Sequence, residues 1–194
     1  MIIMNNENYL QTNRLEAFYD AIIAIIVTVL VLELPQPQTA SIAAIWAIKN
    51  SYFAYLISFL ICVNVWQYHH WIYNHVERIN KKIIWQNIIL LLVVSLIPYL
   101  TTFVANNPFS LLAQVLYGID FLLMNILLYF MSKSLIEINS ENKSLVNALN
   151  VKNALIIPTI IFAVGFIVAF LGYPIAISVC CLITIVRSIL YTLK

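Results

Sequence analysis

The sequence predicts an all-α integral membrane protein with six transmembrane helices, and three observations support this fold class. The 194 residues are 63% hydrophobic and only 9% charged, whereas a soluble domain carries about 25% charged residues. Six apolar segments come close to the length of about 20 residues that a helix needs to cross a bilayer. Lys and Arg concentrate on one side of these segments. A soluble core of this size could not bury so much apolar surface.

The first expected helix spans residues 14–34 and carries three charges at its beginning. Asn13 is a suitable N-cap, and Glu16 stands three residues later, which is the capping-box spacing. Pro35 and Pro37 end the helix, because proline lacks the N–H that a helix needs.

Five further helices are expected to complete a single six-helix transmembrane domain over residues 1–194. The second helix covers about 52–74, and the stretch 41–49 before it favours a short helix on the membrane surface. The third covers about 83–104, with a bend at Pro98. The fourth, fifth and sixth are expected at about 109–131, 151–171 and 173–191.

The distribution of basic residues predicts the topology. Short cytoplasmic loops are enriched in Lys and Arg, and an N-terminus inside the cell places nine basic residues on that side and only Lys49 outside. Both termini are therefore expected in the cytoplasm of a multi-pass protein of the cell membrane. The nine residues are Arg14, Arg78, Lys81, Lys82, Lys133, Lys143, Lys152, Arg187 and Lys194.

Several function classes are not favoured by the residues present. The largest inner loop, 132–150, is too short for a catalytic domain, and three glycines leave no phosphate-binding loop. No Ser or Cys has a recognisable base and orienting partner, so we do not expect an enzyme or a cofactor. The net charge of +2 is scattered, which argues against nucleic acid. His69 and His70 are adjacent and diverge by about 100° on a helix, so they do not make a metal pair.

Asp20 lies about 10 Å into the first helix, and a carboxylate at that depth is costly without a partner. The inner end of the second helix lies at the same depth and reads "WQYHHWIYNH". Its Gln67, His70 and Asn74 recur at i, i+3 and i+7, and we expect this polar stripe to face protein. His69 or His70 is the expected partner of Asp20.

Asp120, in the middle of the fourth expected helix, leaves two interpretations open. It is either a buried hydrogen-bond partner for a Tyr or Asn on a neighbouring helix, or a carboxylate that couples transport to protons or cations. Gly118, two residues earlier, permits a close approach between helices.

Thr28 is the one hydroxyl in the apolar part of the first helix, and it also leaves two interpretations. Its hydroxyl either bonds the carbonyl of Ala24, four residues earlier, or faces water. Helical geometry puts Asp20 roughly 80–160° away from a stripe about 80° wide that includes Thr28. The stripe consists of Arg14, Phe18, Ala21, Ile25, Thr28 and Leu32.

The segment "RLEAFYD", residues 14–20, resembles the R-x-x-x-F-S-D signature of the lysosomal potassium channel family, transmembrane protein 175, and its bacterial relatives. The segment "VWQYHHWI" resembles the His-bearing second helix of that family. Bacterial members are single six-helix repeats of about this length, so the resemblance extends to the whole layout.

The resemblance implies a homotetrameric, potassium-selective channel that contacts membrane lipids and has a pore lined by the first helix. The family has no re-entrant T-V-G-Y-G filter loop, and none occurs here. By this resemblance the potassium pathway passes a constriction at Ile25, then Thr28, then an apolar ring at Leu32. The residues that carry over as braces are Arg14, Phe18 and Asp20, with Tyr19 in place of the signature Ser, and the histidines correspond to His69 and His70.

Two other function classes remain open from the sequence. A proton- or cation-coupled carrier would use Asp20 and Asp120 as coupling carboxylates, although the internal repeats common in carriers are not visible. A membrane scaffold without transport is the third option. Saturation of flux and coupling to a proton gradient would separate a carrier from a channel.

Overall fold

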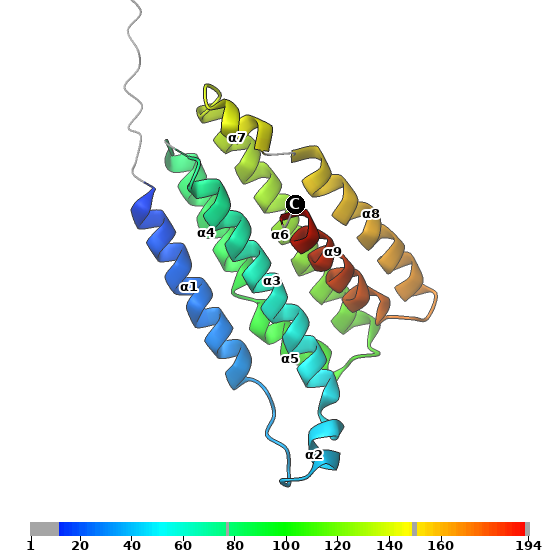
Figure 1. The fold of residues 1–194 in the computed structure, drawn as a ribbon. Coiled ribbons are helices and arrows are strands. Elements are labelled where there is room, and N and C mark those ends of the chain that lie inside the picture. Colours follow the sequence, from blue (N-terminus) through cyan, green and yellow to red (C-terminus); the bar gives the residue numbers. More distant parts are fainter. Residues whose placement is uncertain (1–11, 77, 149–150, 193–194) are drawn as a thin grey trace, which may run out of the picture.

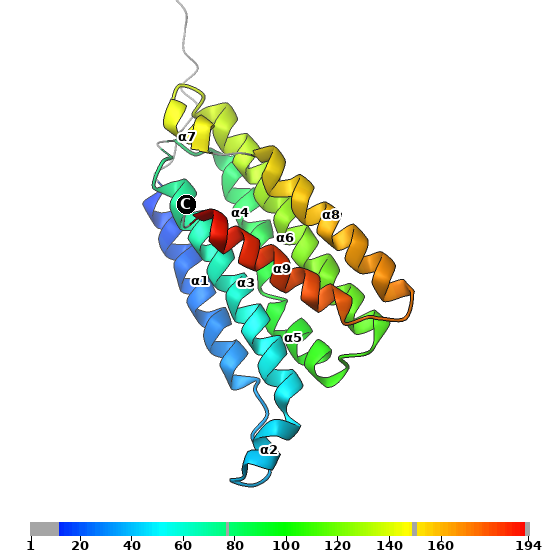
Figure 2. The same ribbon diagram turned by 45° about the vertical axis from the view of Figure 1, so that its right-hand side comes forward.

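The structure is a computed structural model that describes residues 12–76, 78–148 and 151–192. The long helices slant side by side, with α1 at one edge of the bundle and α8 at the other (Figure 1). A view turned by 45° shows α9 crossing in front of its neighbours (Figure 2). The helices are α1 (Asn13–Leu32), α2 (Ile42–Ala47), α3 (Lys49–Tyr73), α4 (Lys81–Val94), α5 (Ile97–Asn106), α6 (Leu111–Ile138), α7 (Lys143–Ala148), α8 (Val151–Phe170) and α9 (Ala176–Thr192).

Helix α1 forms where the apolar run predicts it, but both of its ends differ from the expectation. Thr12 occupies the N-cap position with helical backbone angles and no side-chain cap, so the predicted capping box at Asn13 is wrong. The helix ends at Leu32 and is followed by Glu33 at the C-cap. Leu34 is excluded because a residue before proline disfavours the helical conformation.

The predicted surface helix is present as α2. Ser41 caps it by accepting a hydrogen bond from the backbone N–H of Ala44 at 3.2 Å. Ile42 and Trp46 are largely exposed, in keeping with a helix outside the bundle. Helix α3 then starts at Lys49, three residues before the expected position.

The third expected helix is broken into α4 and α5 rather than bent. The break falls at Ser95 and Leu96, and Pro98 lies in the first turn of α5. Proline is tolerated there because the first N–H groups of a helix have no partner within the helix. The Ser95 hydroxyl donates to the Leu92 carbonyl at 2.7 Å.

Helices α6, α8 and α9 pack together closely beside the rest of the bundle. The close approach predicted at Gly118 is present, since a Cβ there would lie 2.5 Å from Ile177 Cγ2. Gln114 of α6 ties α9 in place by accepting from the Ser178 hydroxyl at 2.7 Å. Helix α6 runs seven residues past the expected end, and the short α7 in the inner loop was not predicted.

Three stretches within the described residues are long and apolar enough to cross a membrane by length and composition: Asn13–Leu32, Lys81–Asn106 counted through the break, and Leu111–Ile138. Two shorter apolar stretches are Ile156–Phe170 and Ala176–Leu190. The protein is therefore an all-α protein with several membrane-compatible helices.

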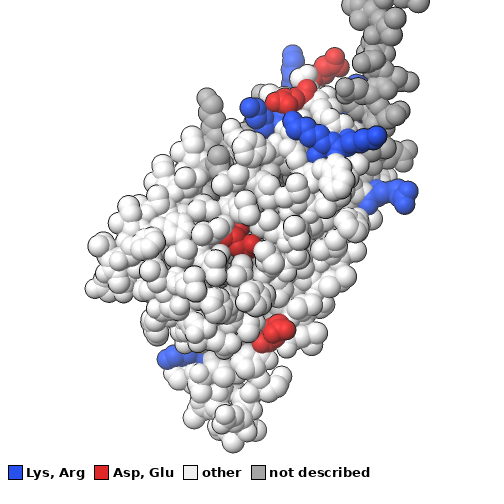
Figure 3. Space-filling view, turned by 180° about the vertical axis from the view of Figure 1, so that it is seen from behind, with Lys and Arg blue, Asp and Glu red and all other residues white. Residues whose placement is uncertain are grey.

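Basic side chains gather at the end of the bundle where α1 begins, which we call the inner end (Figure 3). Arg14 begins α1, and Lys81 and Lys82 begin α4 at this same end. Lys49 begins α3 at the opposite end. Lys194, also expected inside, lies outside the described residues.

Candidate functional site

Helix α1 has a buried face that fixes it against α3, α4 and α5. The buried positions follow a spacing of three and four residues, which keeps them on one side of a helix. Tyr19 is fully buried and Leu30 is 2% exposed. The buried residues are Leu15, Tyr19, Ile23, Ile26 and Leu30.

The opposite face of α1 is uncovered along its whole length. Ile25 is 60% exposed and Leu32 is 79% exposed, although both are large apolar side chains. This face includes every member of the stripe that the sequence defines: Arg14, Phe18, Ala21, Ile25, Thr28 and Leu32. The fold therefore leaves these six residues free for lipid, water or another chain.

Thr28 bonds the backbone of its own helix, as one of the two interpretations expects, and it also lies on the uncovered face of α1. Its hydroxyl donates to the helix backbone, but to the Ile25 carbonyl at 2.7 Å rather than to the expected Ala24. The side chain is nevertheless exposed. Because the proton is used within the helix, the lone pairs of Oγ1 remain available as acceptors, and such an oxygen can meet a cation.

Asp20 is held by the second long helix, but not by the residue expected. Nε1–H of Trp66 donates to Oδ1 of Asp20 at 2.9 Å, so the expected bond from His69 or His70 is replaced by one from Trp66. His70 stacks on the Trp66 ring with centroids 5.3 Å apart. The segment that supplied the expected partners also contains Trp66, whose indole N–H is a donor that can reach a carboxylate.

His69 takes part in a different contact, between α1, α3 and α4. The ring of Tyr19 lies parallel to His69, with centroids 3.6 Å apart, and Tyr73 stacks on the other side at 4.2 Å. Asn87 Nδ2 donates to His69 Nε2 at 2.8 Å. Tyr19 thus takes the place of the signature Ser by stacking, and its buried hydroxyl has no hydrogen-bond partner among the described residues.

The polar stripe on α3 faces outward, contrary to the expectation that other helices would cover it. Gln67, His70 and Asn74 are all exposed within this chain. Asn74 Nδ2 and His70 Nε2 are 3.0 Å apart, so the two side chains bond each other along the helix. The stripe adjoins Trp66 and hence Asp20, which is itself exposed.

Asp120 is 7% exposed in α6. The described part of the chain provides no hydrogen bond to its carboxyl group, so the expected Tyr or Asn partner is not found. The polar pairs around it bond each other instead: the Ser58 hydroxyl is 2.8 Å from Tyr117 Oη and 2.6 Å from Thr101 Oγ1.

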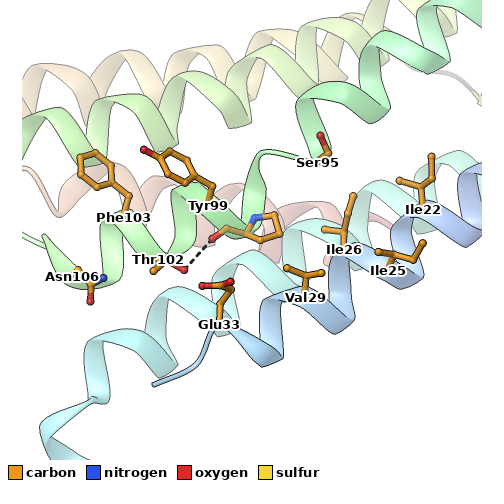
Figure 4. A pocket seen from close by; sticks show the side chains of 11 residues that line it. Ile22, Ile25, Ile26, Val29, Glu33, Ser95, Tyr99, Thr102, Phe103 and Asn106 are labelled. Atoms are coloured by element: carbon orange, nitrogen blue, oxygen red, sulfur yellow. Dashed lines mark hydrogen bonds between the residues drawn. The ribbon is translucent and has the colours of Figure 1, made fainter. Parts of the chain in front are cut away.

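A cavity of about 730 Å³ lies beside Ile25, between α1 and α5 at the break that follows α4 (Figure 4). The wall of the cavity that α1 and its C-cap contribute is apolar except for Glu33. The facing side is partly polar, because it includes Ser95 at the break and Tyr99 and Thr102 of α5. One flank of the uncovered face of α1 is therefore a groove.

Comparison with known proteins places these features in a family. Residues 14–98 match the model of the family described as endosomal/lysosomal potassium channel TMEM175. A protein of Chryseobacterium sp. (strain P1-3) that is named a potassium channel is 33% identical over 161 residues, covering 83% of each chain. A protein of Danio rerio named endosomal/lysosomal proton channel TMEM175 is 28% identical over 113 residues, which are 55% of this chain and 21% of that one.

A solved structure has the same fold. It is the crystal structure of a lysosomal potassium-selective channel TMEM175 homolog from Chamaesiphon minutus. It superimposes with a TM-score of 0.73 at 26% identity, over 91% of this chain and 97% of that one. The extent of these matches, together with the signature on α1, shows that this chain belongs to the endosomal/lysosomal potassium channel TMEM175 family, which is a family of ion channels and not of enzymes.

Proposed function

We propose that this protein is a potassium-selective channel of the cell membrane, formed by a homotetramer in which α1 of each copy lines a central pore. The observation that carries the proposal is the uncovered face of α1. The stripe from Arg14 to Leu32 is exposed in every member, in a chain whose relatives are named potassium channels. Copies of α1 brought together on this face would enclose a pore.

The exposed side chains suit a pore that excludes water until it opens. A ring of Ile25 side chains forms a hydrophobic constriction, and such rings gate by dewetting. Thr28 lies one turn further toward the outer end, with its oxygen free to replace a water of the ion. Leu32 then forms a second apolar ring.

The proposed topology follows from the charges. With the basic end of the bundle in the cytoplasm, α1, α3, α4 with α5, α6, α8 and α9 are the six crossing segments of a single domain. This arrangement places both termini inside and leaves Lys49 outside.

Potassium flux in liposomes tests the function and the pore residues together. Purified protein in vesicles should carry potassium faster than sodium under the same gradient. Ile25→Asn should raise flux because a polar side chain wets the constriction, and Thr28→Val should lower the potassium preference while assembly stays intact. Val27→Ala is the control, since Val27 lies about 100° from Thr28 on the helix. Unchanged flux and selectivity in both pore variants would mean that this stripe only packs against protein.

A second candidate is proton- or cation-coupled transport that uses Asp120 or Asp20. It is favoured by the buried carboxyl of Asp120, which has no hydrogen-bond partner among the residues that the structure describes. One relative is named a proton channel. The same vesicles distinguish the two functions. Coupled transport predicts potassium flux that saturates and that is driven by a proton gradient alone, and Asp120→Asn would abolish that coupling.

A further inference from the structure

Two flanks of α1 border the exposed stripe, one on each side. Helical geometry at about 100° per residue puts the exposed residues Ala17, Ala24 and Val31 about 80° from the middle of the stripe. Ile22 and Val29 lie about 70° from it in the other direction, where they form one wall of the groove beside α5. We call the first set the alanine flank and the second the groove flank.

The alanine flank is shaped for contact with another helix rather than with lipid. Ala17 and Ala24 are two turns apart, and small side chains let helix backbones approach closely inside a membrane. The exposed stripe of α8 contains large side chains instead, among them Ile160 and Ile167. Asp20 lies further round α1 on the same side as the alanine flank, and lipid is a costly neighbour for its charge. A second protein chain is therefore the better cover for this side.

The groove flank continues toward the inner end along α4. One stripe of α4 points to the same side as the groove, because its residues follow a spacing of three and four and end at Ser95, which keeps helical backbone angles and lines the groove. Trp85 in this stripe is 65% exposed, and its indole N–H has no acceptor among the described residues. Lys81 adds a positive charge at the inner end. The stripe consists of Lys81, Trp85, Ile88, Leu92 and Ser95, all exposed.

The donor on α4 and the carboxylate on α1 lie at similar depths. The ring of Tyr19 stacks on His69, and Asn87 of α4 donates to the same histidine, so these positions share one level. Asp20 follows Tyr19 directly, and Trp85 precedes Asn87 by two residues, which leaves the two side chains within about one helical turn in depth. A rotation about the membrane normal preserves depth, so the two groups remain level when they belong to different copies.

We propose that the copies of this chain pack head to tail, with the alanine flank of one against the groove flank of the next, and that Asp20 accepts the indole N–H of Trp85 from the neighbouring copy. Oδ1 of Asp20 already accepts from Trp66 of its own chain, and the other oxygen has no hydrogen bond within the described residues. The inference deepens the proposed tetramer and rests on it.

The angles between the two flanks and the stripe suit such a ring. In a ring of four identical helices, the two neighbours of each helix lie about 45° to either side of the direction to the axis. The two flanks of α1 therefore meet the neighbours while the stripe between them still faces the pore. The two surfaces differ, so the contact is heterologous and closes only as a ring.

Cross-linking between introduced cysteines tests the arrangement. Val31 follows Tyr19 by twelve residues and Tyr99 follows Asn87 by twelve, so the exposed positions 31 and 99 lie at similar depth on opposite flanks. In membranes treated with a short bismaleimide, the chain with both Val31→Cys and Tyr99→Cys should give a ladder of covalent dimer, trimer and tetramer. The native cysteines are buried, which keeps the background low.

Matched controls should remain monomeric on the denaturing gel. They are each single variant, and Val31→Cys combined with Ile160→Cys, which is exposed on α8. Covalent dimers from Val31→Cys alone would overturn the proposal, because they indicate a self-complementary interface. Native mass spectrometry of the unmodified protein separates the two levels of the argument. A tetramer whose double-cysteine variant gives no ladder overturns this interface alone, whereas a single-chain mass overturns the proposed channel as well.

The stability of the tetramer in detergent tests the bond between copies. Trp85→Phe should raise the protein concentration at which the tetramer is half dissociated by about fourfold, since four bonds of the strength typical inside membranes are lost. Trp71→Phe, at an exposed position of α3, is the control and should leave this concentration unchanged. In a chain that carries Asp20→Ala, Trp85→Phe should have no further effect, because the acceptor is already absent. An equal effect of Trp85→Phe with and without Asp20 would overturn the assignment of this bond.

Discussion

The hydrogen bond between Trp66 and Asp20 joins α1 to α3 within the chain. Its removal should measurably lower the thermal stability of the protein. Trp66→Phe keeps an aromatic ring beside His70 and removes the N–H that donates at 2.9 Å. Side-chain hydrogen bonds inside membranes have coupling energies of about 0.6 kcal/mol on average and about 1.7 at most. Because Asp20 is charged, we expect a value in the upper part of that range. For a chain of this size it corresponds to a fall in Tm of about 2–7 °C.

A double-mutant cycle on purified protein in detergent measures this bond. Trp66→Phe and Asp20→Ala should each lower Tm, and the double variant should lose less than the sum, since both changes remove the same bond. The control cycle pairs Asp20→Ala with His69→Gln, whose bond goes to Asn87 instead. If Asp20 couples to His69 but not to Trp66, the claim that Trp66 holds Asp20 is refuted.

Three further predictions follow from the packing and the charges. Tyr19→Phe should leave Tm unchanged or raise it, because it removes a buried hydroxyl without a partner in the described structure and keeps the stack on His69. A clear fall in Tm, measured by thermal unfolding, would contradict this. Gly118→Ala should destabilise the protein by about 1–3 kcal/mol, since the new Cβ meets Ile177 at 2.5 Å, and Ile177→Ala in the same chain should recover part of the lost Tm. A Cys introduced at Asn107 should react with an impermeant maleimide from outside the cell and one at Glu141 only from inside, and the reverse pattern would invert the topology.

The positions of the long helices could be predicted because each is a run of apolar residues whose length matches a bilayer. Their ends could not be predicted as well. Leu34 falls outside α1 because of the proline that follows it, and α4 breaks at Ser95, before Pro98, because the helix must stop ahead of a residue without an N–H. The length of α6 depends on contacts with other helices that no local pattern records.

The uncovered face of α1 could be predicted from helical periodicity, but the partners of its polar side chains could not. The sequence placed Asp20 at the correct depth beside the second long helix, yet three donors on that helix lay within reach. The choice of Trp66 over His69 and His70 depends on the rotation of α3, which buries His69 against Tyr19. That rotation also turns Gln67 and Asn74 outward, against the expectation that they would be covered.

Accessibility of α1 during ion flow tests the central claim most directly. The cysteines of the chain, Cys62, Cys180 and Cys181, are buried, so a new cysteine can be read against a low background. Thiol reagents or silver ions should block potassium flux through Thr28→Cys, because this side chain faces the proposed pore. They should leave Ile23→Cys, on the buried face, unaffected. Block at position 23 with none at position 28 would contradict a pore lined by this face of α1.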